Sequence, residues 1–339
     1  MKKALIIGST GQDGAYLAKF LGDKGYRVYG TYRKQPSSNL WRLRYLDIHK
    51  KIELIPIDML DKESITKGIA TSQPDEIYNL ASQSTIKASL EQPITGGEDT
   101  GLAVTRILEA IRKINPKIRF YQASSRELFG PGGTGVRTEA SPFQPANPYA
   151  AAKLYAYWMV NIYRNKYSIF ACNGILFNHE SPLRGLEFVS RKISNAVAKI
   201  FLGIERQLTL GNLEAKRDWG YAPDYVEAMW AMLQQPQPDD YVIATGEAHS
   251  VKEFVVKAFG MVGLNWQEYV RVDKKYPVLL YDGTLRGDYS KAKRVLGWEP
   301  KVKFDGLVGL MVKEDMSRWQ RWLKGERFPW DAPHDKPLS

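Results

Sequence analysis

Cysteine is nearly absent from this chain, since Cys172 is the only one among its 339 residues. A single thiol cannot close an internal disulfide, so the sequence excludes a disulfide-stabilised scaffold and favours a reducing compartment. Apolar runs are short, and none is long enough to span a membrane. Lys2 and Lys3 precede an apolar segment, but glycines follow where a signal peptide would have its cleavage site. We therefore expect a cytoplasmic protein without a membrane partner.

Motifs for metal or nucleic-acid binding are missing as well. The chain has no zinc-ligand spacing, so we predict no metal site. It contains 48 Lys and Arg against 37 Asp and Glu, and its formal net charge of +11 suggests an anionic partner. The basic residues are spread along the chain, without a helix-turn-helix pattern or an aromatic-basic ribonucleoprotein motif. We therefore expect a phosphorylated small molecule rather than nucleic acid.

The first 32 residues predict a strand, a glycine turn, a helix and a second strand. Residues 4–7 form an apolar run, Gly8, Gly11 and Gly14 follow at three-residue spacing, and residues 26–32 resume a strand pattern. In such a unit the first glycine permits a tight turn, the second lets the backbone approach a pyrophosphate, and the third lets the helix pack closely on the strand. A glycine triplet alone is often only a flexible loop, but its place between a strand and a helix predicts dinucleotide binding.

Strands and helices continue to alternate through the first half of the chain. A helix is predicted from about residue 99 to 113, and further strands at residues 52–57, 76–80, 119–123 and 168–176. This alternation predicts an α/β protein with a Rossmann-type doubly wound parallel sheet and a smaller C-terminal substrate-binding lobe. Ligands of such a sheet bind at the carboxyl ends of its strands.

The second half predicts amphipathic helices at residues 188–202, 224–233 and 304–322. We expect an NADP-binding Rossmann domain over residues 1–180 and a nucleotide-sugar-binding lobe mainly over residues 181–330. A strand near residues 241–244 suggests that about 221–246 return to the Rossmann core. Residues 331–339 form a polar, proline-containing tail.

The end of the second strand indicates which dinucleotide binds. An NAD site usually offers Asp or Glu there for the ribose hydroxyls, but this chain has Arg33, whose guanidinium suits the 2′-phosphate of NADP. Alternatively, Arg33 is a surface cation in a loop. At the end of the third strand, Asp58 is placed to accept a hydrogen bond from the adenine amino group. The residues expected to bind the cofactor here are Gly8, Gly11, Gln12, Asp13, Gly14, Arg33, Asp58, Met59, Leu80, Ala81, Gln83 and Ser84.

Two pairs of polar residues supply candidate catalytic groups. On a helix that begins near residue 147, Tyr149 and Lys153 share one face, and a nearby cation favours the phenolate, which accepts a proton at neutral pH. This pair alone is a weak signal, because a solvated helix face has the same spacing. Ser125 and Glu127 follow the fifth strand, although Glu127 alone suits a helix N-terminus equally well. Together the four residues supply a hydroxyl donor, an acid or base and a phenol at one site.

The glycine triplet and the Tyr-x-x-x-Lys pair resemble the extended short-chain dehydrogenase/reductase superfamily. Longer stretches are similar to its GDP-mannose 4,6-dehydratase family, namely residues 11–17, 78–84, 120–124, 174–182 and 216–220. The resemblance covers nearly the whole chain. It is most specific around Asn178 and His179, which few other members of the superfamily carry.

The resemblance implies an internal redox cycle that converts GDP-mannose to GDP-4-keto-6-deoxymannose. Tyr149, held by Lys153, would take the proton of the sugar O4 while C4 gives a hydride to NADP. Ser125 stands where the family usually has Thr and would hydrogen-bond O4. Glu127 would remove the C5 proton and assist loss of the C6 hydroxyl as water, after which the hydride returns to C6. The matching positions also imply Lys153, His179 and Arg184 beside the cofactor, and Asn178, Lys192 and Arg217 at the nucleotide diphosphate.

Departures from the family pattern leave the substrate open. Arg126 stands where the family usually has Ser, and it would favour the charged form of the neighbouring Glu127 if it points inward. The alternatives are a related enzyme that dehydrates a GDP-heptose, or one that epimerises or reduces another nucleotide sugar. A non-catalytic NADP-sensing regulator is permitted by the basic charge, but it has no need for Tyr149 and Glu127 together. The resemblance also favours a homodimer or homotetramer, with contacts from residues 33–44 and from the helices near Leu102 and Tyr155.

Overall fold

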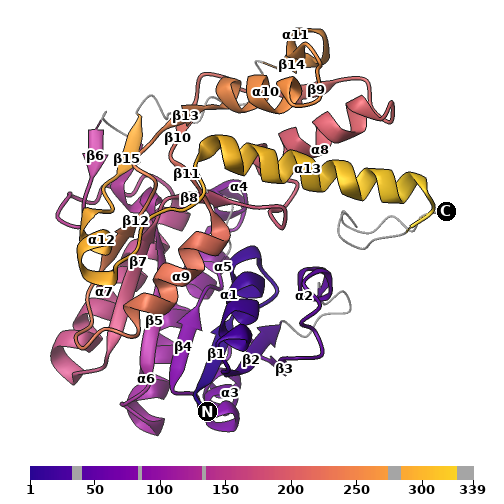
Figure 1. Ribbon diagram of the computed structural model, residues 1–339. Helices are drawn as coiled ribbons and strands as arrows, with labels where there is room; N and C mark the ends of the chain where they lie inside the picture. The colour runs from indigo at the N-terminus through magenta and orange to yellow at the C-terminus, as the bar shows by residue number, and fades with distance from the viewer. Residues whose placement is uncertain (33–39, 83–85, 132–134, 274–283, 327–339) are drawn as a thin grey trace.

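The computed structural model describes residues 1–32, 40–82, 86–131, 135–273 and 284–326 (Figure 1). A seven-stranded parallel sheet forms its centre, with the strand order β12-β7-β5-β4-β1-β2-β3. The chain starts in the middle of the sheet, winds outward to β3, and then crosses back to β4 and winds the other way. This is a doubly wound Rossmann-type sheet, so the predicted fold class is confirmed. The strands are β1 (Lys3–Ile7), β2 (Arg27–Tyr32), β3 (Glu53–Pro56), β4 (Glu76–Asn79), β5 (Arg119–Ser125), β7 (Ala171–Leu176) and β12 (Tyr241–Ile243).

Helices cover both faces of this sheet, which explains why its central strands are apolar in nearly continuous runs. Successive residues of a strand point to opposite faces, so Ala4 and Ile6 join one hydrophobic cluster while Leu5 and Ile7 join another. The first cluster includes α1 (Gln12–Asp23), α2 (Trp41–Tyr45), α9 (Ala222–Met232) and α12 (Ser290–Leu296). The second includes α3 (Lys62–Ser72), α6 (Ala103–Ile114) and α7 (Pro148–Tyr167).

Several element boundaries differ from the predicted ones by a few residues. The strand predicted at residues 168–176 begins only at Ala171, because Ser168 ends α7 in the left-handed conformation, with a φ of 52°. The helix predicted from about residue 99 begins as one π-helical turn, Glu98–Leu102, and continues as α6. Two short helices precede this turn, α4 (Ile86–Glu91) and α5 (Pro93–Gly97).

A helical lobe lies over the carboxyl ends of the strands, in the upper part of Figure 1. Its main helices are α8 (Val189–Phe201), α10 (Val251–Gly260) and α13 (Phe304–Leu323), which share one hydrophobic cluster. Arg191 of α8 and Asp315 of α13 are fully buried and form an ion pair at 2.6 Å. The lobe also contains α11 (Trp266–Tyr269), the parallel pair β9 (Leu208–Leu210) and β14 (Val270–Val272), and the antiparallel pair β10 (Lys216–Arg217) and β13 (His249–Ser250).

Short segments connect the sheet to the lobe. A 3₁₀ helix, η2 (Arg126–Phe129), directly follows β5. The remaining strands pair in parallel, β8 (Asn178–Glu180) with β11 (Trp219–Tyr221), and β6 (Gly135–Arg137) with β15 (Leu285–Gly287). None of the helices in the described ranges is long and apolar enough to cross a membrane.

Candidate active site

The glycine turn between β1 and α1 leaves no room for side chains. Gly8 has a φ of 91°, which few other residues adopt, and a Cβ there would lie 2.9 Å from the backbone nitrogen of Ala81. A Cβ on Gly14 would lie 2.2 Å from the carbonyl oxygen of Gly8. Helix α1 begins after Gly11 without a side-chain cap hydrogen bond, so no side chain caps the backbone N–H groups of its first turn. This turn fits the pyrophosphate of a dinucleotide, because its bare backbone permits close approach.

A cleft of about 480 Å³ lies at this turn, between the carboxyl ends of the strands and the lobe. The structure brings most of the sequence-predicted site residues to its walls, although they come from distant parts of the chain. Those that line it are Gly8, Gly11, Gln12, Asp13, Gly14, Leu80, Ser125, Glu127, Tyr149, Lys153, Asn178, His179, Arg184 and Arg217. Arg126, Glu187 and Phe188 line it too.

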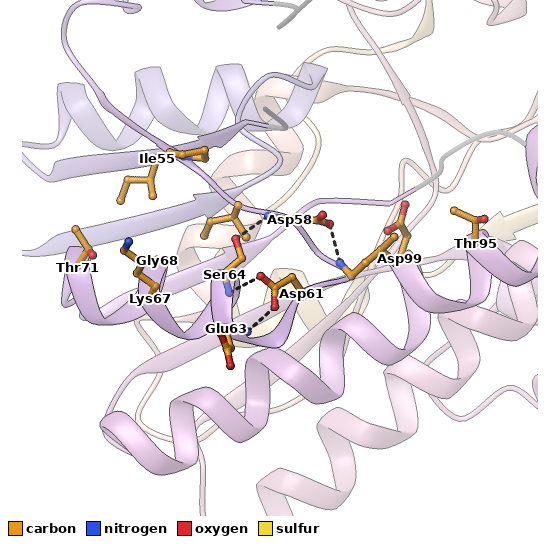
Figure 2. A pocket seen from close by; sticks show the side chains of 13 residues that line it. Ile55, Asp58, Asp61, Glu63, Ser64, Lys67, Gly68, Thr71, Thr95 and Asp99 are labelled. Carbon is orange, nitrogen blue, oxygen red and sulfur yellow. Dashed lines mark hydrogen bonds between the residues drawn. The ribbon is translucent and has the colours of Figure 1, made fainter. Parts of the chain in front are cut away.

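Other predicted site residues lie elsewhere. Asp58 lines a separate cavity of about 840 Å³ beside β3, α3 and α5, where its carboxylate accepts a hydrogen bond from the Leu60 backbone at 2.9 Å (Figure 2). Met59 is buried next to it. Lys192 does not line the cleft, and its ammonium donates to the carbonyl oxygen of Thr209 in the lobe at 2.7 Å. The predictions for Arg33, Gln83 and Ser84 lie outside the described residues.

Helix α7 carries the phenol and the ammonium into the cleft. Asn147 caps the helix by accepting a hydrogen bond from the Ala150 backbone, and both Tyr149 and Lys153 line the cleft. The Lys153 ammonium donates to the carbonyl oxygen of Ala123 at 2.7 Å and lies 5.8 Å from the centre of the Tyr149 ring. Burial lowers the pKa of Lys153 to about 8, although the Asp13 carboxylate opposes this shift.

The pKa of Tyr149 moves in the direction opposite to that predicted. Burial, with a smaller contribution from the Glu127 carboxylate, raises the pKa of Tyr149 to about 12, while a hydrogen bond with Ser125 lowers it in part. The predicted stabilisation of the phenolate assumed that Lys153 acts on the phenol directly. The ammonium instead bonds the Ala123 carbonyl, and the phenol has lost its hydration.

Arg126 points into the protein, toward Glu127. Its Nε lies 2.9 Å and its Nη2 2.8 Å from Oε1 of Glu127, and the two side chains are only 4% and 13% exposed. Ser125 accepts a hydrogen bond from the Glu127 backbone at 3.2 Å and thereby caps the 3₁₀ helix. The candidate base therefore stands beside a buried cation, a placement that the sequence had left open.

His179 forms an ion pair with Asp13 at the floor of the cleft. Its Nε2 lies 2.8 Å from Oδ2 of Asp13, and its Nδ1 donates to the carbonyl oxygen of Phe177 at 2.7 Å. Burial acts to lower the pKa of His179, but the Asp13 carboxylate outweighs it and the net shift is upward. For Asp13 burial acts to raise the pKa, and the imidazolium reverses this, so the pKa falls. Gln12 donates to the His179 carbonyl at 3.1 Å, so this cluster ties β8 to the start of α1.

A family model described as GDP-mannose 4,6 dehydratase matches residues 5–311. The chain belongs to the GDP-mannose 4,6 dehydratase family. GDP-mannose 4,6 dehydratase 1 of Arabidopsis thaliana is 48% identical to it over 330 residues, with 94% of this chain and 91% of that protein covered. GDP-mannose 4,6 dehydratase of Homo sapiens is 47% identical over 339 residues, with 92% of this chain and 91% of that protein covered.

Membership of the GDP-mannose 4,6 dehydratase family confirms the resemblance predicted from the sequence, and with it the prediction of an enzyme. The fold is shared more widely. The crystal structure of dTDP-glucose 4,6-dehydratase from Bacillus anthracis, in complex with NAD, superimposes with a TM-score of 0.81, covering 96% of this chain and 100% of that one. The sequence identity is 20%, so this similarity supports the fold alone.

One buried carboxylate that holds the site together was missed by the sequence analysis. In this member of the GDP-mannose 4,6 dehydratase family, Asp218 is fully buried and accepts hydrogen bonds from Thr245, Gly246 and Gly287 at 2.6 to 3.1 Å. It thereby joins the segment after β12 to β15 and to the strand pair that carries Arg217. Asp218 lies within residues 216–220, which resemble the family, but a carboxylate next to Trp219 and Gly220 does not by itself distinguish a buried anchor from a surface residue.

Proposed function

We propose that this chain is a nucleotide-sugar 4,6-dehydratase that converts GDP-mannose to GDP-4-keto-6-deoxymannose and retains NADP through each turnover. The observation that carries the proposal is the convergence of Tyr149, Ser125 and Glu127 in one cleft beside the glycine turn. These residues come from α7, β5 and η2, and a hydride-transfer site alone has no use for the carboxylate. Membership of the GDP-mannose 4,6 dehydratase family supports the substrate.

The residues of the cleft fit a nicotinamide dinucleotide. The bare backbone of Gly8, Gly11 and Gly14 would hold the pyrophosphate, and Lys153 and His179, which line the same cleft, would lie beside the cofactor. When bound, the cofactor would accept a hydride from C4 in its oxidised, positively charged form and would return that hydride to C6 from its reduced form. We propose NADP rather than NAD because Arg33, which lies outside the described residues, suits a 2′-phosphate.

The protein residues then move the protons. Tyr149 takes the O4 proton while Ser125 donates a hydrogen bond to O4, so that O4 becomes a carbonyl oxygen. The new ketone acidifies C5, and Glu127 takes the C5 proton as the bond between C6 and its hydroxyl oxygen breaks. Glu127 passes this proton to the departing oxygen, which leaves as water. One proton is then added at C5, and release of the proton that Tyr149 took from O4 balances it. The substrate is oxidised at C4 and reduced at C6, so the reaction would have no net redox change.

Because the pKa of Tyr149 is high, the proposed mechanism requires positive charge near the phenol. A phenol with a pKa of about 12 is a poor proton acceptor at neutral pH, so positive charge must collect beside it when substrate binds. Lys153, with a pKa of about 8, is mainly charged at neutral pH and lies 5.8 Å from the ring centre. Asn178 and Arg217, at the lobe side of the cleft, are proposed to contact the nucleotide diphosphate, with Lys192 farther into the lobe.

We also propose that the chain forms a homodimer, or a tetramer of two such dimers. Tyr155, Trp158 and Ile162 recur along one face of α7 and are 40%, 53% and 45% exposed, and Leu102, from the π-helical turn that packs on α7, is 43% exposed. The Tyr155 hydroxyl shares a hydrogen bond with Thr105 of α6 at 3.0 Å, so the two helices present one surface. A contiguous apolar surface of this kind is typical of protein contacts.

Mass spectrometry of nucleotide sugars incubated with the protein and catalytic NADP tests the proposed function. GDP-mannose should lose one water, with no net NADPH formed. Reaction of GDP-heptose or another nucleotide hexose instead would keep the mechanism and replace the substrate. In Tyr149→Phe, turnover should collapse while NADP binding persists. Absence of turnover with every sugar, although NADP binds, would favour the non-catalytic sensor and refute the proposal.

A further inference from the structure

Arg126 and Glu127 form a buried ion pair between neighbours in the sequence. Both guanidinium contacts go to the same oxygen, Oε1, at 2.9 and 2.8 Å, and the Arg126 side chain is only 4% exposed. Adjacent side chains usually diverge, but the 3₁₀ turn that starts at Arg126 lets this pair converge. Burial excludes the water that screens surface ion pairs, so the attraction between the guanidinium and the carboxylate is stronger than at the surface.

Glu127 is thereby restrained at two points. The Ser125 hydroxyl accepts a hydrogen bond from its backbone at 3.2 Å, and the planar guanidinium of Arg126 holds its carboxylate. The Nε donates a hydrogen bond to Oε1 and the Nη2 lies beside the same oxygen, so two guanidinium nitrogens of fixed geometry face Oε1, where a lysine would offer one ammonium. Tyr149 lines the same cleft as Glu127, so the phenol and the carboxylate share the space in which one sugar would bind.

We infer that Arg126 is a positioning residue, which orients Glu127 for removal of the C5 proton without taking part in oxidation at C4. The inference rests on the proposed function and deepens it. In the proposed mechanism Tyr149 and Ser125 carry out oxidation at C4. Arg126 contacts Glu127, which removes the C5 proton in the following step. Loss of Arg126 should therefore slow proton removal and elimination selectively.

The test is Arg126→Met, which removes the charge and keeps much of the volume, compared with Arg126→Lys, which keeps the charge and loses the planar guanidinium. Three rates are followed with GDP-mannose in D₂O: appearance of reduced nicotinamide by absorbance, deuterium entry at C5, and release of product. A positioned acid or base contributes about 100-fold or more. In Arg126→Met, deuterium entry and product release should fall about 10- to 100-fold while reduced nicotinamide forms normally and accumulates. Arg126→Lys should fall between it and the wild type.

A double-mutant cycle with Glu127→Gln separates positioning from general damage. If Arg126 acts through Glu127, adding Arg126→Met to Glu127→Gln should slow the reaction little further. Wild-type rates in Arg126→Met, or equal slowing of C4 oxidation and C5 exchange, would overturn the inference and leave the proposed function standing. If Arg126→Met fails to fold, the same cycle with Arg126→Lys decides. Absence of dehydration by the wild type would instead remove the proposed function and this inference together.

Discussion

Replacing Gly14 with alanine tests the packing of α1 on the glycine turn. The added Cβ would lie 2.2 Å from the Gly8 carbonyl oxygen and 2.6 Å from the Ser9 Cα. Ordinary contact begins near 3.4 Å, and both obstacles are backbone atoms, so α1 and the turn must separate by about 1 Å. Overpacking of this kind costs about 1–3 kcal/mol. The displaced turn should also bind NADP more weakly, because its N–H groups no longer converge on the pyrophosphate.

Gly22→Ala in the same helix is the matched control. Gly22 is exposed, and a Cβ there meets nothing within 4 Å outside the helix's own backbone. Alanine should therefore stabilise this variant by about 0.5–1 kcal/mol, through helix propensity alone. Denaturant unfolding reports the stability of both variants, and calorimetric titration with NADP reports their affinity. If Gly14→Ala matches the wild type in both assays, the close approach of helix and turn does not occur as described.

Three further predictions concern burial, charge and association. Asp315→Asn should lower the free energy of unfolding by about 3–5 kcal/mol, because it removes the charge of the carboxylate that pairs with the fully buried Arg191; a loss below 1 kcal/mol in denaturant unfolding would contradict this. Burial acts to raise the pKa of Asp240, but hydrogen bonds from Arg164 outweigh it, so the pKa of the folded protein lies below the unfolded value of about 3.8. The pair therefore stabilises the fold above pH 3.8, and this stability is lost as the pH falls through the folded pKa. Asp240→Asn should therefore flatten the acid limb of stability, measured by unfolding between pH 7 and pH 3. Trp158→Asp should shift the protein toward monomer in sedimentation with its secondary structure intact, and an unchanged assembly would exclude this face of α7.

The candidate site was predictable wherever local pattern carries the chemistry. Gly8, Gly11 and Gly14 lie at the turn as predicted, because a strand, a turn and a helix that follow one another are shaped by short-range sterics. Tyr149 and Lys153 share a face because helix geometry brings residues four apart together. The carboxyl ends of parallel strands then collect Ser125 and residues 178–179 at one cleft, as the predicted topology requires.

What the sequence determined by itself is therefore the doubly wound fold, the glycine turn and the shared face of Tyr149 and Lys153, because periodicity and spacing are set by neighbouring residues; the prediction of Asn178, His179, Arg184 and Arg217 came from the resemblance to the family. The tertiary structure alone decided that Arg126 faces Glu127, that Asp58 lines another cavity, and that the pKa of Tyr149 rises. Each of these outcomes depends on which distant segments exclude water from a side chain and which polar atoms they bring to it. Burial and partner choice belong to the packed chain, and no local pattern encodes them.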